Sequence, residues 1–305
     1  MKRRDFLKGT AASSALVTLG GLSLSSFTTA PDIKKITILH TNDVHSHIDP
    51  FPASDPRNPN MGGVARRATL IQEIRKENPN VLLLDAGDIF QGTPYFNYYG
   101  GELEFKLMSM LDYDLATLGN HDFDNGIDGF YTQLPHAKFD FVSANYDFKN
   151  TILDGIVKPY KIFIKDGIKI GVFGLGVELQ GLVDKKLYKE TVYNDPVETA
   201  KEMTRILKHE KKCDLVICLS HIGFKYKDEP DRVCDVLLAR RTKDIDLIIG
   251  GHTHTFLDKP VIETNADGKQ VLVNQVGCYG INLGRIDFYF DADKSKSHSG
   301  RSITV

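Results

Sequence analysis

Five short blocks of the chain contain residue types that bind metal ions, namely carboxylates, imidazoles and an amide. Such side chains supply the nitrogen and oxygen atoms that zinc, manganese and iron accept as ligands. Two of the blocks repeat an i, i+2 spacing, which in extended backbone places both side chains on one face, so that both can reach one ion. The candidate metal ligands are Asp43, His45, Asp88, Asn120, His221, His252 and His254.

The number of candidates indicates how many ions to expect. Seven exceed the four ligands that one tetrahedral zinc ion needs, which favours two divalent ions sharing a bridging carboxylate. Calcium fits less well because it prefers oxygen ligands alone. Two such ions would retain net positive charge beside Asp43 and Asp88, attract a phosphate and lower the pKa of a bridging water. The expected reaction is therefore attack by a metal-bridged hydroxide at phosphorus.

A further histidine in the blocks completes the predicted chemistry. His121 follows Asn120 and can face the same pocket without being a ligand. Asp124 lies three residues further on and can accept a hydrogen bond from the other ring nitrogen of His121, which would fix its tautomer. A positioned imidazolium stabilises phosphoryl oxygens and assists the leaving group. We predict His121, Asp124 and Asn120 as catalytic residues.

The five blocks share one local context, because each directly follows an apolar, β-branched run. Runs of this type are typical of buried strands. Residues just past the carboxyl ends of neighbouring strands can meet at one edge of a sheet, so the blocks can converge. The runs cover residues 36–39, 81–84, 115–118, 215–219 and 245–249.

Helical periodicity alternates with these strands, which predicts one layered α/β domain over about residues 33–290 without internal repeats. Asp-Gly at 166–167 predicts a hairpin, and Asp195-Pro196 predicts a capped helix start. Helices are expected at 64–76, 102–112, 127–134, 196–209 and near 230–240, and further strands at 140–144, 160–164, 168–173, 260–263, 270–274 and 283–290.

Composition excludes several other classes. The 305 residues carry a formal net charge of −2, so no basic face for nucleic acid is expected. The four cysteines lack zinc spacing, and Cys213 and Cys218 lie about 16 Å apart if extended, too far to pair. We assign the cysteines no chemistry.

Residues 1–30 are expected to be an export signal peptide, with a basic start, an apolar stretch and a Thr-Thr-Ala end. Arg3-Arg4 followed by Asp5-Phe6-Leu7-Lys8 resembles a twin-arginine signal, and an ordinary secretory signal is the alternative. The expected location is the periplasm, without a stable membrane anchor. The polar tail at 291–305 is expected to fray.

Several polar or aromatic residues near the blocks are interpreted as structural rather than functional. Asp122 is read as a cap or turn residue, and Asp85 as either a turn residue or one that orients a neighbour. His47 is read as structural, with a place at the pocket rim as the alternative. The segment 92–99 contains aromatic residues that can stack on a base, but a packed surface loop is slightly favoured.

Together the blocks resemble the calcineurin-like metallophosphoesterases. Within that superfamily, about residues 35–290 look like the catalytic domain of the 5′-nucleotidase/UDP-sugar hydrolase family. The segments that carry the resemblance are 40–47 (HTNDVHSH), 87–94 (GDIFQGTP), 119–124 (GNHDFD), 220–221 (SH), 250–255 (GGHTHT) and 274–280 (NQVGCYG) with 283–285 (LGR).

The resemblance implies a four-layer αββα sandwich and a division of the ligands. One metal would take Asp43, His45 and His254, and the other Asn120, His221 and His252. Asp88 would bridge the two ions, and His121 with Asp124 would form the catalytic pair.

Substrate specificity is less directly indicated. The family's usual C-terminal nucleotide-binding domain is expected to lie beyond this chain, and a separate protein is one possible source of it. A 5′-nucleotide or nucleotide-sugar is the expected substrate. The alternatives are a 2′,3′-cyclic-nucleotide or general phosphodiesterase, and a catalytic subunit that acts only with a nucleotide-binding partner.

Overall fold

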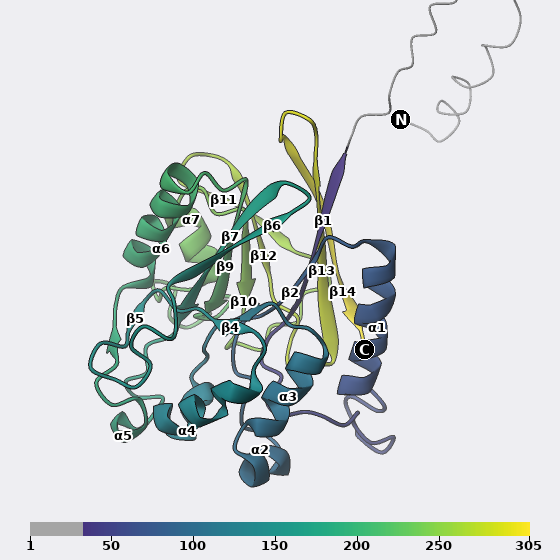
Figure 1. The fold of residues 1–305 in the computed structure, drawn as a ribbon, viewed down its shortest axis with the longest axis vertical. Coiled ribbons are helices and arrows are strands. Elements are labelled where there is room, and N and C mark those ends of the chain that lie inside the picture. Colours follow the sequence, from purple (N-terminus) through teal and green to yellow (C-terminus); the bar gives the residue numbers. More distant parts are fainter. Residues whose placement is uncertain (1–32) are drawn as a thin grey trace, which may run out of the picture. The chain divides into compact units, whose positions relative to one another are not determined.

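The computed structural model describes residues 33–305, so the predicted signal peptide lies outside the described residues. The apolar runs form the central strands of two six-stranded sheets (Figure 1). The first has the order β14 (Lys296–Thr304), β13 (Asn282–Phe290), β1 (Lys34–Thr41), β2 (Val81–Asp85), β3 (Leu115–Ala116) and β4 (Asp140–Phe141). The second has the order β11 (Val261–Thr264), β12 (Gln270–Asn274), β10 (Leu247–Gly250), β9 (Leu215–His221), β7 (Ile168–Gly176) and β6 (Tyr160–Lys165). A small antiparallel pair joins β5 (Tyr146–Asp147) and β8 (Val192–Tyr193).

The strands are apolar on both faces because each sheet is covered on both sides. In β2, Leu82 and Leu84 enter the core between the two sheets, whereas Leu83 points to the outer core. In β9, Ile217 belongs to the core between the sheets and Val216 to the opposite outer core. This alternation follows from the two-residue repeat of a strand.

Helices complete the outer layers. Helices α1 (Val64–Glu77), α3 (Glu102–Met110) and α4 (Gly126–Gln133) supply side chains to the outer core of the first sheet. Helices α6 (Pro196–Thr204) and α7 (Asp235–Arg241) do the same for the second sheet. Figure 1 shows α6 and α7 on one side of the strands and α1 on the other. The predicted four-layer αββα sandwich is confirmed.

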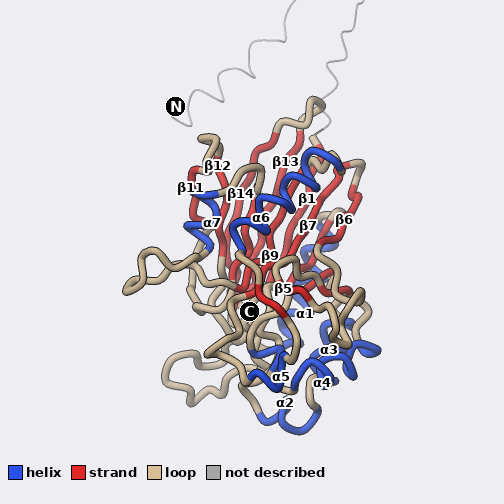
Figure 2. Tube along the Cα trace, turned by 90° about the vertical axis from the view of Figure 1, so that its left-hand side faces the viewer, coloured by secondary structure: helices blue, strands red, loops and turns tan. Residues whose placement is uncertain are grey.

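The remaining helices are short and gather near the ends of the sheets. Figure 2 shows α2 (Pro94–Tyr99) and α5 (Lys185–Tyr188) with α3 and α4 at one end of the strands. Single 3₁₀ turns span His121–Phe123 and Leu134–His136. No helix of residues 33–305 is long and apolar enough to cross a membrane.

Most predicted elements are present, and some differ in length. The hairpin turn at Asp166 and Gly167 is confirmed, since both residues have positive φ and Lys165 pairs with Ile168. Asp195 caps α6 by accepting the N–H of Glu198 at 2.8 Å. The predicted helix 196–209 ends as an α-helix at Thr204 and continues as a π-helical turn over Arg205–Glu210.

The expectation that residues 291–305 fray is wrong. Most of them, Lys296–Thr304, form β14, which pairs with β13 in antiparallel register from Asn282↔Thr304 to Phe290↔Lys296. Polar composition did not prevent pairing because the backbone supplies the hydrogen bonds of a strand. Ile303 and Val305 also pack against the outer core of the first sheet.

The segment 92–99 is the short helix α2 rather than a loop. Phe96 is buried, whereas Tyr98 is 82% exposed. All four cysteines are free and buried.

Candidate metal centre

The five blocks meet at the end of the sheets where the parallel strands β1, β2, β3, β9 and β10 terminate. His221 is the last residue of β9, and the other candidates lie in the loops that follow their strands. Six of the candidates form two groups of three residues, and within each group the ligand atoms all lie within 4.8 Å of one another. The first contains Asp43, His45 and His254, and the second contains Asp88, His221 and His252.

The distances place the two groups beside each other. His45 Nε2 is 3.0 Å from His254 Nε2, which is 3.3 Å from Asp43 Oδ1. In the second group, His221 Nε2 is 3.0 Å from Asp88 Oδ2. The same Asp88 oxygen is 3.7 Å from His45 Nε2. Asp88 therefore reaches both groups.

Asn120 joins the second group through its side-chain oxygen. Asn120 Oδ1 is 2.8 Å from His252 Nδ1. The backbone N–H of His252 donates to Asp43 Oδ1 at 2.9 Å and thereby connects the two groups. All seven candidates thus converge.

Backbone carbonyls select which ring nitrogen each histidine presents. His221 Nδ1 lies 2.7 Å from the carbonyl of Ala86, so it donates and leaves Nε2 with a lone pair. His45 Nδ1 lies 3.2 Å from the carbonyl of Phe90 and 3.1 Å from that of Gln91. Both imidazoles therefore present Nε2 to the centre, as metal-binding histidines do.

The candidate ligands occupy strained backbone. Positive φ is uncommon for residues other than glycine and costs of the order of 1 kcal/mol or more per residue. Such residues persist where the surroundings hold them in place, and they cluster at functional sites. Five candidates have φ between 49° and 73°, namely Asp43, His45, Asp88, His252 and His254.

Two glycines allow the close approach of these loops. A Cβ at Gly119 would lie 2.2 Å from Asp88 Oδ1, and a Cβ at Gly251 would lie 2.6 Å from His221 Nδ1. Any side chain at either position would displace a candidate ligand. Glycine at these positions therefore gives the backbone room beside the candidate ligands.

The electrostatics of the centre favour positive charge. Burial lowers the pKa of His221, but Asp88 and Asp43 outweigh burial and raise it to about 10. His254 follows the same pattern, with a pKa raised to about 10 against burial, chiefly by Asp43. Burial lowers the pKa of His45 and holds that of His252 at about 4. The two carboxylates thus attract positive charge to the centre, which protonated imidazoles or bound cations can supply.

The donor atoms fit divalent metal ions. His221 Nε2 is fully buried, and its 3.0 Å approach to Asp88 Oδ2 lacks hydrogen-bond geometry, so a cation beside both atoms would satisfy them. His45 Nε2 and His254 Nε2 face each other at 3.0 Å, an arrangement that a cation between two lone pairs stabilises. Mixed nitrogen and oxygen donors suit zinc, manganese or iron.

His121 lies next to the centre and makes different contacts. Its ring lies with its centroid 5.2 Å from that of His45. His121 Nδ1 donates to Asp124 Oδ2 at 2.8 Å, as the sequence spacing predicted. This hydrogen bond is the largest influence on His121 and raises its pKa. The imidazole is therefore oriented and favours its protonated form.

Asp122 and Asp85 hold the loops rather than joining the candidate ligands. The Asp122 carboxylate accepts the N–H groups of Gly119 at 2.8 Å and Asp88 at 3.0 Å, in addition to those of Ile89 and Phe90. Asp85 accepts the N–H of Gly87 and the hydroxyl of Thr41. The turn role predicted for Asp122 is confirmed, and Asp85 orients its neighbours.

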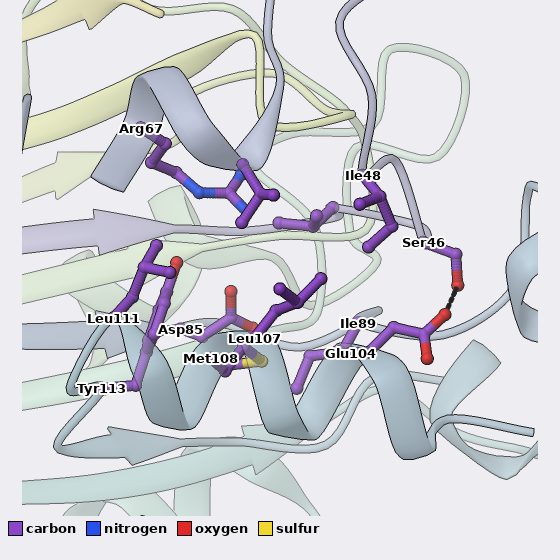
Figure 3. Close-up of a pocket in the computed structure, with 12 residues that line it drawn as sticks. Ser46, Ile48, Arg67, Asp85, Ile89, Glu104, Leu107, Met108, Leu111 and Tyr113 are labelled. Carbon is purple, nitrogen blue, oxygen red and sulfur yellow. Dashed lines mark hydrogen bonds between the residues drawn. The ribbon is translucent and has the colours of Figure 1, made fainter. Parts of the chain in front are cut away.

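A cavity of about 20 Å³ lies behind the loop that carries His45, which is roughly the size that one water molecule needs. Figure 3 shows its lining, with Arg67 from α1 and Glu104 from α3. Ser46 donates to Glu104 Oε1 at 2.5 Å and ties the loop to α3. Arg67 Nε and Glu104 Oε2 are buried without hydrogen-bond partners.

Two buried amides that support the centre were missed by the sequence analysis. Asn42 donates to Asp43 Oδ2 at 2.6 Å and to the carbonyl of Gly277. Gln275 donates to the carbonyl of Gly251 at 2.5 Å and accepts the N–H of Thr255. Both lie inside the motif segments 40–47 and 274–280, and that position was the signal available for finding them.

Comparison with known proteins agrees with this geometry. The sequence profile of the calcineurin-like phosphoesterases matches residues 36–256, and that of the TAT (twin-arginine translocation) pathway signal sequence matches residues 1–20. The chain therefore belongs to the calcineurin-like phosphoesterase family, a class of metal-dependent phosphoric ester hydrolases.

Individual relatives point within that class to 5′-nucleotidases. A snake venom 5′-nucleotidase of Naja atra is 37% identical over 86% of this chain and 51% of its own length. The trifunctional nucleotide phosphoesterase protein YfkN of Bacillus subtilis is 35% identical over 84% of this chain and 18% of its own. The 5′-nucleotidase precursor of Thermus thermophilus superposes with a TM-score of 0.80 at 32% identity, covering 89% of this chain and 55% of that one. The chain thus spans about half the length, or less, of these relatives.

Proposed function

We propose that this chain hydrolyses phosphate esters of 5′-nucleotides or nucleotide-sugars with two divalent metal ions. The observation that carries the proposal is the pair of adjacent three-residue groups connected through Asp88, whose Oδ2 lies 3.0 Å from His221 Nε2 and 3.7 Å from His45 Nε2. The 5′-nucleotidase relatives support the nucleotide part of the substrate.

The residues divide as the family resemblance implies. Asp43, His45 and His254 would hold one ion, Asn120, His221 and His252 the other, and Asp88 would contact both. Two bound ions would supply positive charge to phosphoryl oxygens and lower the pKa of a water, so that hydroxide is available for attack at phosphorus. The chain then needs no nucleophilic side chain of its own.

His121 has the contacts needed to protonate or stabilise a leaving oxygen. Asp124 fixes Nδ1 as a donor and favours the imidazolium. Nε2 of His121 is therefore the atom that can donate a hydrogen bond or proton to substrate. The N–H of His121 in turn donates to Asp88 Oδ1 at 2.8 Å, which fixes the imidazole's backbone to the metal centre.

A substrate panel tests the proposal. The full chain, purified with its metals, is assayed with AMP, UDP-glucose, 2′,3′-cyclic AMP and p-nitrophenyl phosphate, and its metal content is measured. AMP or UDP-glucose should give the highest kcat/KM, with about two metal ions per chain. A flat profile across the four compounds would contradict the nucleotide assignment, and a metal content near zero in an active preparation would contradict the dinuclear centre.

A phosphodiesterase activity is the second candidate, favoured by the similarity to YfkN, whose name describes a trifunctional nucleotide phosphoesterase. In the same panel, this function predicts the highest kcat/KM for 2′,3′-cyclic AMP. Turnover of any nucleotide by this chain alone would rule out a subunit that acts only with a nucleotide-binding partner. Activity that arises only on adding such a partner would favour that interpretation.

We also propose that the protein is exported to the periplasm by the twin-arginine route. The support is the match of residues 1–20 to the signal profile. Replacing both Arg3 and Arg4 with lysine should leave the precursor in the cytoplasm, and continued export of that variant would argue for the ordinary secretory route.

A further inference from the structure

Three aromatic rings lie beside the metal centre and have no part in the chemistry described above. His47 and Phe51 follow the β1 block, and Tyr279 follows the Gln275 segment. The His47 ring centroid is 4.2 Å from that of Tyr279 and 5.2 Å from that of Phe51. Phe51 and Tyr279 close the cluster at 6.0 Å. We call these three residues the ring cluster.

The ring cluster is adjacent to one of the two candidate metal groups. The Tyr279 ring centroid lies 6.0 Å from that of His45 and 5.8 Å from that of His254. The N–H of Tyr279 donates to the carbonyl of Asp43 at 2.7 Å. Tyr279 therefore contacts all three residues of that group through its ring or its backbone.

The ring cluster is neither core nor freely exposed surface. His47, Phe51 and Tyr279 are all half-buried, so each keeps part of its surface open to solvent. Tyr279 has a φ of 62°, an uncommon conformation for a bulky residue that is maintained only where the surroundings fix it. Packing alone does not account for a half-exposed tyrosine ring on strained backbone next to a reaction centre.

A cation belongs to the same part of the chain as the rings. Arg57 is exposed and lies in the same loop as Phe51. Aromatic rings are the groups on which bases stack in proteins that bind single-stranded nucleic acids, and arginine adds cation–π contacts there.

We propose that the ring cluster is a stacking subsite for the nucleobase of the substrate, with Tyr279 as its main specificity-determining residue. A phosphate held at the metal centre places the remainder of a nucleotide within reach of these rings. This inference rests on the proposed action on nucleotides. It assigns base recognition to this chain itself.

The first test separates base recognition from chemistry. The full chain with its metals is assayed with AMP and with ribose 5-phosphate, which carries the same ester without the base. Tyr279→Leu should lower kcat/KM for AMP about tenfold, which corresponds to about 1.4 kcal/mol, within the range of one base–aromatic contact. The same variant should change kcat/KM for ribose 5-phosphate less than about twofold, and Tyr279→Phe should retain both activities.

Tyr289 provides a matched control. It is another half-buried tyrosine, but it pairs with Lys35 at the opposite end of β1 from the metal centre. Tyr289→Leu should leave both activities unchanged. Equal losses for AMP and ribose 5-phosphate in Tyr279→Leu would overturn the subsite and assign Tyr279 a purely structural role, as would no change with either substrate.

A second test does not depend on turnover. The chain contains no tryptophan, so Tyr279→Trp places a single tryptophan, which can be excited selectively at about 295 nm, inside the ring cluster. AMP should quench its emission saturably and ribose 5-phosphate should not, while Tyr289→Trp should respond to neither. Absence of quenching by AMP overturns the subsite. Quenching without hydrolysis of AMP retains the subsite and contradicts the proposed function instead.

Discussion

Asp88 and His121 lie in the same centre, but their contacts differ, so we expect substitutions at the two positions to affect metal content and rate differently. Asp88 approaches His221 and His45 from the two candidate metal groups, whereas the His121 side chain is held by Asp124. We expect Asp88→Asn to lower metal content and rate together. We expect His121→Asn to lower kcat by about 10²–10⁴-fold, the usual contribution of a general acid, with metals retained.

The measurements are metal content by mass spectrometry and kcat on the same preparations. His209 supplies the control, because it is an exposed histidine paired with Asp244, and His209→Asn should change neither quantity. If His121→Asn lost its metals, His121 would have to be counted among the ligands.

The convergence of the seven candidate ligands was predictable from sequence, but the geometry of their contacts was not. Spacing and the preceding apolar runs identified all seven candidates and the His121–Asp124 contact, since these are local patterns. The orientation of His221 depends on the carbonyl of Ala86, 135 positions away in the chain. The supports supplied by Asn42 and Gln275 also join distant segments, and no local pattern specifies such pairings.

At the scale of elements, helix α3 supports the loop that carries His45 through Glu104. Burial raises the pKa of Glu104 above its ordinary value of 4.5, and the hydrogen bond from Ser46 only partly opposes this. The folded state therefore binds the proton more tightly than the unfolded state. Linkage then requires stability to fall as pH rises from about 4.5 through the raised pKa.

Glu104→Gln keeps the hydrogen bond from Ser46 but cannot ionise, so it should lack this fall. Urea unfolding from pH 4 to pH 8 should show the variant gaining stability relative to the natural chain as pH rises. The neighbouring Glu102 has its pKa lowered by Lys106, so Glu102→Gln should show the opposite trend. A constant difference between Glu104→Gln and the natural chain at all pH values would refute the coupling.

Strand β14 shows why a polar composition misled the prediction for the C-terminal segment. Its burial pattern is mostly exposed, so hydrophobic periodicity gave no signal. The strand forms because β13 offers an unpaired edge. The N–H of Val305 also donates a hydrogen bond to the carbonyl of Ile281, and the carbonyl of Val305 accepts one from the N–H of Gly62. Side-chain patterns report burial, whereas edge pairing depends on backbone groups that every residue carries.

Deleting residues 292–305 should therefore destabilise the fold. The deletion would expose the β13 edge and uncover the core behind Ile303 and Val305. We expect a fall in Tm of roughly 10 °C, since a loss of several kcal/mol lowers Tm by about 2–4 °C per kcal/mol in a chain of this size. Exposed edges also promote association, which light scattering would detect. Arg301→Ala, a surface change within β14, should leave Tm within about 2 °C, and an unchanged Tm in the deletion would show that β14 contributes nothing.

At the scale of the whole molecule, the alternation of strands and helices predicted the layered class, and the family resemblance supplied the four layers. The assignment of strands to the two sheets was beyond local patterns. Strand β13 pairs with β1 although 250 positions separate Thr37 from its partner Asp287. Such contacts depend on which surfaces remain uncovered once the central strands have assembled.

Because distant loops converge on one centre, we expect metal binding to stabilise the whole fold. Asp43 and Asp88 are 0% and 1% exposed, and burying carboxylates without compensating cations is costly. Ions that bind only the folded state stabilise it by RT ln(1 + [L]/Kd), about 4 kcal/mol at a thousandfold excess over Kd.

Removing the ions with EDTA should lower Tm by roughly 10 °C, and zinc or manganese added after dialysis should restore it. The Asp88→Asn variant should respond less to both treatments, because one carboxylate that needs the cations is gone. A natural chain whose Tm is the same with and without chelator, at a confirmed loss of metal, would show that the loops hold the centre together without any ion.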